Sequence, residues 1–236
     1  MILFLLLLPL AALSTSHPLH PTLHRKSPTT PSTTLQWTQA FTLIANVTNP
    51  SLDLNPSINH FQLTGIHIGA GLSTAVLTAT TGRILYENGT GTPQTTGIAS
   101  DLGGVYPYSL TITPLPADEP DADYVDYVGI DIGTAQDGIG VDSISGGGEW
   151  PALFGPERGT FVVCYEEKPA YGRPQYPVRF ARERVVDGVA YQQIPLGCAP
   201  IVLVPQCAEL EAVEPGAVYN HDFVRSVRCF EDVGGG

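Results

Sequence analysis

Basic residues are scarce in this sequence of 236 residues. It contains 11 lysines and arginines against 23 aspartates and glutamates, which gives a formal net charge of −12. Nucleic acids and anionic membranes select proteins that present a basic face. The charge balance therefore argues against both nucleic acid and membrane as partners.

The motifs of several enzyme classes are absent as well. The sequence has no Gly-x-Ser-x-Gly, no His-Glu-x-x-His and no phosphate-binding loop, so it lacks the signatures of serine hydrolases, zinc proteases and nucleotide-binding enzymes. No two cysteines have the Cys-x-x-Cys spacing that zinc sites use. We predict no catalytic, cofactor-binding or metal-binding residues, and no cofactor.

The amino-terminal segment is apolar but short. Residues 2–13 are almost wholly apolar, and the small residues Ser14, Thr15 and Ser16 follow. Such a run is too short to span a bilayer, and it has the length and ending of a secretory signal peptide. We predict a signal peptide over residues 1–16 and a secreted protein of the extracellular space or cell wall.

Proline, serine and threonine dominate residues 17–36. A segment of this composition cannot bury an apolar core, so we predict a disordered linker. Residues 37–232 follow as a single all-β domain, and their length is enough for a substantial core.

Short apolar runs alternate with glycine and proline turns along this domain. Within residues 41–48, every second side chain is apolar, which is the pattern of a half-buried strand. Many short strands of this kind favour a single β-sandwich or barrel-like domain. The predicted strands are 41–48, 61–68, 72–79, 83–87, 106–112, 128–132, 161–165, 176–181, 189–194 and 201–204.

Local signals predict turns and one helix. The apolar phase slips by one residue after Gly65, which indicates a β-bulge at Thr64-Gly65. Asn88-Gly89 and Asp187-Gly188 are pairs that type I′ hairpin turns prefer. A short C-terminal helix is predicted behind the potential N-cap Asn220, because apolar residues recur there at helical spacing: Phe223, Val224, Val227 and Phe230.

Two N-glycosylation sequons begin at Asn46 and Asn88. Asn46 falls on the polar side of its predicted strand, and Asn88 falls at a predicted hairpin tip, where a glycan fits at the surface. We predict an N-glycan on both asparagines.

An even number of cysteines in a secreted chain indicates disulfides, here two among Cys164, Cys198, Cys207 and Cys229. If residues 199–206 are extended, their ends lie roughly 30 Å apart at about 3.3 Å per residue, whereas a disulfide needs Cα atoms within about 7 Å. This disfavours a Cys198–Cys207 bond. Of the remaining pairings we predict Cys164–Cys198 with Cys207–Cys229.

Several segments together resemble a family of small secreted proteins of filamentous fungi, a domain family of unknown function. The resemblance covers roughly residues 38–210, and its motifs are strands, turns and a sequon, so it implies a fold and lends no catalytic residues. The spacing around Cys164, Cys198 and Cys207 is also similar, whereas Cys229 falls outside the shared pattern. The matching segments are 41–48, 67–71, 75–77 and 83–90.

Acidic residues cluster between Asp118 and Asp142 without an intervening lysine or arginine. Several converging carboxylates would suit calcium, but the spacing is not that of an EF-hand loop, so a solvated acidic loop is the favoured interpretation. A glycosidase would need two carboxylates across a sugar, for which Asp126, Asp131 and Glu149 are candidates. Glu149 precedes Trp150, whose ring would suit a sugar cleft.

Histidines raise two further alternatives. Cleavage after Ser16 would expose His17 as an amino-terminal copper ligand, as in fungal copper oxygenases, with a partner among His60, His67 and His221. A disordered tail lacks the preorganisation that a metal site requires, so we predict no tight copper site. His67 lies between two apolar strand residues, and it is interpreted as a structural histidine that bonds turn carbonyls.

The favoured hypothesis is therefore a secreted, glycosylated, non-catalytic β-domain. Its expected partner is a cell-wall glycan or an extracellular protein. The alternative is a carbohydrate-active enzyme, either a glycoside hydrolase or a copper oxygenase. A concave cleft with carboxylates of shifted pKa would favour the enzyme.

Overall fold

The computed structural model describes residues 34–89, 96–101, 104–142, 150–167 and 174–233. These residues lie in the compact unit Pro31–Gly236. The predicted signal peptide and nearly all of the predicted linker fall outside the described residues. None of the helical structure that is described is long and apolar enough to cross a membrane.

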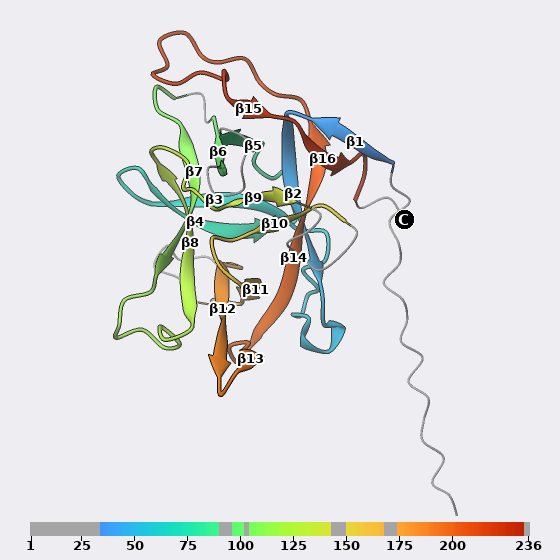
Figure 1. Ribbon diagram of the computed structural model, residues 1–236, viewed down its shortest axis with the longest axis vertical. Helices are drawn as coiled ribbons and strands as arrows, with labels where there is room; N and C mark the ends of the chain where they lie inside the picture. The colour runs from blue at the N-terminus through green and yellow to red at the C-terminus, as the bar shows by residue number, and fades with distance from the viewer. Residues whose placement is uncertain (1–33, 90–95, 102–103, 143–149, 168–173, 234–236) are drawn as a thin grey trace, which may run out of the picture. The chain divides into compact units, whose positions relative to one another are not determined.

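The predicted all-β class is confirmed (Figure 1). One short 3₁₀ helix, η1 (Pro50–Leu52), accompanies the described strands. The strands are β1 (Leu35–Thr38), β2 (Ala40–Val47), β3 (Gln62–Gly69), β4 (Leu72–Thr78), β5 (Tyr86–Gly89), β6 (Thr96–Ser100), β7 (Tyr108–Pro114), β8 (Val125–Ile132), β9 (Gly140–Asp142), β10 (Ala152–Phe154), β11 (Gly159–Cys164), β12 (Val178–Val186), β13 (Val189–Gln192), β14 (Cys198–Ala208), β15 (Val224–Arg225) and β16 (Val227–Phe230).

Fourteen strands form one large sheet, while β9 and β10 pair separately. The order runs β13-β12-β11-β14-β2-β3-β4-β8-β7-β6-β5-β15, and β16 joins β1 to β14. A further ladder between β12 and β8 closes a circuit through β11, β14, β2, β3 and β4. The sheet therefore curves back on itself, with β7, β6, β5 and β15 extending from the closed part.

The main core lies on the inner side of this circuit. Phe41, Leu43 and Ala45 on β2 are fully buried, and they occupy alternate positions as the sequence pattern predicts. Phe161 on β11 and Phe180 on β12 complete the core with an edge-to-face ring contact at 5.2 Å. Each large apolar side chain buried in this way stabilises the fold by about 1.5–3 kcal/mol.

The disulfides of the structure are Cys164–Cys198 and Cys207–Cys229, the pairing that we predict. The first joins directly opposed residues of β11 and β14. The second joins β14 to β16, and β16 in turn pairs with β1. Strand β1 begins at Leu35, two residues before the predicted start of the domain at residue 37.

The predicted C-terminal helix is wrong. Strands β15 and β16 occupy this segment instead, and Asn220 only caps a local turn by accepting a hydrogen bond from the Asp222 amide at 3.1 Å. Val227 and Cys229 also fit a period of two, and both are buried while Arg228 between them is exposed. Pairing with β1 and the bond from Cys229 to Cys207 outweigh the helical spacing of four apolar residues.

Two of the three predicted turn features also differ in the structure. Asn88-Gly89 is no hairpin tip, because both residues continue β5 and pair with Gly97 and Thr96 of β6. The register of β3 with β4 runs unbroken through Gly65 and shifts only between His67 and Gly69, so the predicted bulge is misplaced. A Cβ at Gly65 would lie 3.1 Å from the Arg83 guanidinium, so glycine there makes room for Arg83.

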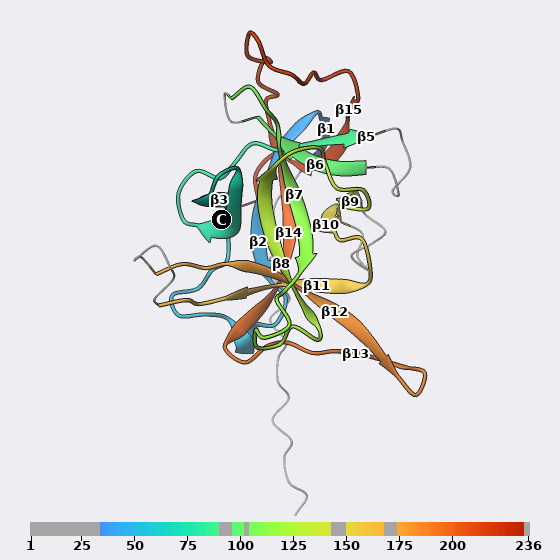
Figure 2. The same ribbon diagram turned by 90° about the vertical axis from the view of Figure 1, so that its left-hand side faces the viewer.

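The Asp187-Gly188 turn is confirmed. Both residues have positive φ, 52° and 78°, as a type I′ turn requires. The turn joins β12 to β13 in a hairpin that projects from the rest of the sheet (Figure 2).

Candidate binding face

Both tryptophans of the chain are exposed on one face of the β1–β16 ladder. Trp37 on β1 is directly opposite Arg228 on β16, and two positions further along Leu35 is opposite Phe230. Residues two apart on a strand share a face, so Trp37, Arg228 and Phe230 lie on the same side. The Trp150 ring packs on Phe230 with centroids 5.4 Å apart. We call this surface the tryptophan face.

Exposure of these two rings is unusual for their type. Trp37 is 71% exposed and Trp150 is 44% exposed, whereas tryptophan is highly buried on average. Each ring offers a flat apolar surface beside polar groups. This combination is typical of a surface that contacts another molecule.

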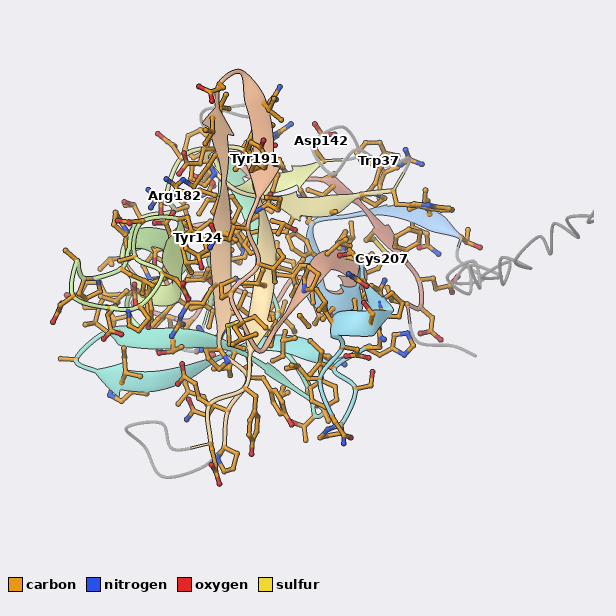
Figure 3. The ribbon with its side chains drawn as sticks, turned by 90° about the horizontal axis from the view of Figure 1, so that it is seen from below. Trp37, Tyr124, Asp142, Arg182, Tyr191 and Cys207 are labelled. Carbon is orange, nitrogen blue, oxygen red and sulfur yellow. A yellow bond between two sulfur atoms is a disulfide. The ribbon has the colours of Figure 1, made fainter. Side chains whose placement is uncertain are left out.

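A cavity of about 240 Å³ opens beside Trp37. Figure 3 shows Trp37 and Asp142, which both line it, on the same side of the molecule. Strands β15 and β16 contribute Arg225 and Arg228, and Thr96 and Ser226 add hydroxyl groups. The cavity thus combines one exposed aromatic ring with donors and acceptors of both charges.

Glu87 of β5 holds the inner wall of this cavity in place. Its carboxylate accepts a hydrogen bond from Arg225 Nη1 at 2.7 Å and another from the Val141 amide at 2.8 Å. Burial raises the pKa of Glu87 above its ordinary value, while the Val141 amide and Arg225 oppose this rise. Since each carboxylate oxygen already has a protein partner, Glu87 orients Arg225 and is poorly placed to transfer a proton to a substrate.

Arg228 differs from Arg225 in having no carboxylate partner among the described residues. Its side chain is exposed on β16 directly opposite Trp37. Arg225 is fixed by Glu87, whereas Arg228 can donate hydrogen bonds to a bound molecule from its planar fork.

The glycosidase candidates of the sequence do not meet. Asp126 and Asp131 both lie on β8, five positions apart, so they point to opposite faces of the strand. Asp126 is buried and 3.4 Å from Arg182 Nε, and burial raises its pKa. Asp131 accepts hydrogen bonds from the Ser73 amide at 3.0 Å and the Thr111 hydroxyl at 2.8 Å. Glu149 lies outside the described residues.

The acidic residues between Asp118 and Asp142 are dispersed over separate elements. Asp121 accepts a hydrogen bond from the Tyr124 hydroxyl in a loop before β8, whereas Asp142 is at the end of β9. Across the described part of the chain, no group of three or more histidine, cysteine, aspartate or glutamate side chains is close enough to hold a metal ion.

The described histidines also lie on separate elements. His67 is exposed on β3 opposite Ser73, and no hydrogen bond within the described residues ties its ring to turn carbonyls. His221 contacts Asp101 Oδ2 through Nε2 at 2.7 Å, and Asp101 also accepts a hydrogen bond from Tyr86 at 2.9 Å. His60 has a positive φ of 65° in the loop before β3. His17 lies outside the described residues.

The two sequon asparagines occupy different surroundings. Asn46 lies on β2 opposite Val202, on the other side of the strand from the core residues, and is half-buried. Asn88 is enclosed in β5 between β6 and β15, and its Oδ1 is buried with no hydrogen-bond partner among the described residues.

A family model described as Domain of unknown function (DUF7907) matches residues 38–207. The chain belongs to this family. No solved structure matches it.

A curated relative is known for this DUF7907 chain. Antigenic protein SchS34 of the filamentous fungus Stachybotrys chartarum is 32% identical over 201 residues, which cover 83% of this chain and 87% of the relative. The predicted resemblance to a fungal family of unknown function is thereby confirmed at the level of the family.

The tryptophan face is built largely from outside the matched DUF7907 residues. Trp37 precedes the match, and Arg225 and Arg228 follow it. Sequence reasoning missed this face, because it assigned Trp37 to the domain edge and residues 223–230 to a helix. One signal in the sequence could have indicated a strand in this segment. Val227 and Cys229 are two residues apart, as side chains on one face of a strand are, and Cys229 is expected to form a disulfide.

Proposed function

We propose that this protein is a secreted, glycosylated, non-catalytic β-domain that binds glycan chains through its tryptophan face. The observation that carries the proposal is the exposure of both tryptophans on one side of the β1–β16 ladder, next to a polar cavity. The apolar faces of sugar rings stack on aromatic side chains, and their hydroxyls need the donors and acceptors that Arg228, Asp142 and Ser226 offer.

The non-catalytic part of the proposal is supported by the carboxylates. Glu87 is fully engaged by Arg225 and Val141, and the Asp126–Asp131 pair is split between two faces of β8. Secretion is supported by two disulfides, since such bonds persist in oxidising compartments. The fungal relative makes a cell-wall glycan the first class to test.

The test is a glycan array probed with the purified chain, with and without calcium. Trp37→Ala and Trp150→Ala are expected to weaken binding at least about tenfold each, because each removes a stacking surface. Tyr191→Ala on the projecting hairpin is the matched control, since Tyr191 is also an exposed aromatic residue on a strand.

Three results would count against the proposal. The first is an array without any bound glycan, and the second is equal loss of binding in the Tyr191→Ala control. The third is release of shortened sugars from a bound oligosaccharide, which would show an enzyme.

A further inference from the structure

A second cavity lies behind the tryptophan face, on the other side of β5. Side chains alternate along a strand, so Tyr86 and Asn88 face one way while Glu87 between them faces the first cavity. The second cavity has a volume of about 420 Å³, within the roughly 300–1,000 Å³ range of small-molecule sites.

Three tyrosines shape this second cavity. Tyr86 and Tyr219 form its inner wall, and Tyr106 is 55% exposed at the mouth beside Val218, which is 64% exposed. A hydrogen bond of 2.9 Å from the Val218 amide to the Val105 carbonyl joins the two loops that carry the mouth. This hydrogen bond therefore fixes the exposed rim, which consists of aromatic and apolar side chains.

The polar groups of this cavity carry no charge. Its lining includes the amides of Asn88 and Asn220 and the hydroxyls of Ser109 and Thr134, but none of the described lining residues is acidic or basic. Burial and the Asp101 carboxylate raise the pKa of Tyr86, so its hydroxyl stays protonated. Burial and Asp101 raise the pKa of Tyr219 as well.

One polar atom of the lining residues lacks a hydrogen-bond partner among the described residues. The Oδ1 of Asn88 is buried and unpaired there, although nearly all buried polar groups in proteins are paired. Tyr219, in contrast, has the Asp101 carboxylate as its polar neighbour. The unpaired acceptor belongs to a residue that lines the cavity, so a donor on a bound molecule could pair with it.

We infer that this cavity binds an uncharged small molecule with one or more flat rings and a hydrogen-bond donor. The rings stack among Tyr86, Tyr106 and Tyr219, and the donor satisfies Asn88 Oδ1 after a small shift of that side chain. An anionic or cationic ligand is disfavoured, because no lining side chain offers an opposite charge and its desolvation would be uncompensated. This site lies on the other face of β5 from the first cavity, and the inference does not rest on the glycan proposal.

The test uses phenylnaphthylamine, an uncharged two-part aromatic molecule with one N–H, whose fluorescence rises in apolar surroundings. Titration of the full mature chain without N-glycans is expected to show one saturable site. Tyr106→Ala is expected to weaken binding about tenfold through loss of a ring contact. Thr134→Trp, which places a bulky ring at the mouth, is expected to abolish binding. Anilinonaphthalene sulfonate, which adds a negative charge to similar rings, is expected to bind at least tenfold more weakly.

Tyr191→Ala serves again as the control, because Tyr191 is an exposed tyrosine on β13, outside the cavity lining. Unchanged binding in this control, together with the two losses above, supports the inference. Absence of saturable binding, equal binding in all variants, or equal affinity for the sulfonated probe overturns it. Because Trp37 and Trp150 do not line this cavity, failure here leaves the glycan proposal standing.

Discussion

At the scale of single residues, Glu87 and its neighbours decide how the two cavities are built. Glu87 fixes Arg225 with one oxygen and the β9 backbone with the other, while Tyr86 beside it engages Asp101. A strand of four residues thus connects two polar networks on its opposite faces.

The first prediction concerns the Glu87–Arg225 ion pair. Glu87→Gln is expected to lower the free energy of unfolding by about 1–3 kcal/mol, because both carboxylate oxygens accept hydrogen bonds and the glutamine amide replaces one of these buried acceptors with a donor. Urea denaturation measures this change. The control is Glu183→Gln, whose partner Arg158 is 3.6 Å away and largely exposed, and it is expected to change stability by less than about 0.5 kcal/mol. Equal effects of the two variants would contradict the assignment.

A second prediction at this scale concerns the two sequons. Asn46 is expected to carry an N-glycan in most molecules and Asn88 in a smaller fraction, because β6 and β15 enclose Asn88 and its Oδ1 is buried. Mass mapping of glycopeptides from protein secreted by a fungal host provides the measurement. Complete modification of Asn88 would show that its strand opens more readily than its pairing indicates.

At the scale of elements, the Cys207–Cys229 bond tethers the tryptophan face to the core. Replacing both cysteines by serine is expected to lower stability by about 3 kcal/mol, given the sequence separation of 22 residues. The same double variant is expected to weaken glycan binding, because β16 and β1 lose their covalent link to β14.

The matched variant removes Cys164 and Cys198. This bond spans a comparable separation of 34 residues and joins β11 to β14, which carry none of the face. It is expected to reduce stability by a similar amount while glycan binding in the folded protein stays unchanged. Melting temperature and array signal are the two readouts. Equal loss of binding in both double variants would show that the tether has no specific role.

Elements differ in how far the sequence determines them. The alternation along β2 and the Asp187-Gly188 hairpin follow from local chemistry, and the structure has both. The helix prediction for the C-terminal segment is wrong because spacing alone cannot separate a short helix from a strand whose partner is 195 residues away along the chain, as Leu35 is from Phe230. The tryptophan face forms only through this long-range pairing of β1 with β16, so no local sequence pattern could predict it.

At the scale of the whole molecule, burial of two carboxyl groups links stability to pH. Burial raises the pKa of Glu87 and of Asp126. Between the ordinary values near about 4 and these raised values, the native state binds more protons than the unfolded state, so stability falls as pH rises. The net charge of −12 acts in the same direction, because acidification reduces self-repulsion.

The free energy of unfolding is therefore expected to be larger at about pH 5 than at about pH 8. Asp126→Asn is expected to show a shallower pH dependence, because it removes one of the two groups. Urea titrations at both pH values, with and without about 1 M salt, separate the local effect from the screened long-range repulsion. Greater stability at the higher pH would refute the prediction.

The position of β5 between the two cavities has one more consequence. Residues of β5 line both cavities, and so do residues of the segment that runs from Val218 through Arg225. A molecule that shifted this ladder from one side would alter the free energy of binding on the other side. Thermodynamic reciprocity then demands that the factor by which a bound ring compound changes glycan affinity equals the factor by which glycan changes the affinity for that compound. A protein of this design would report on two chemically unrelated molecules at once.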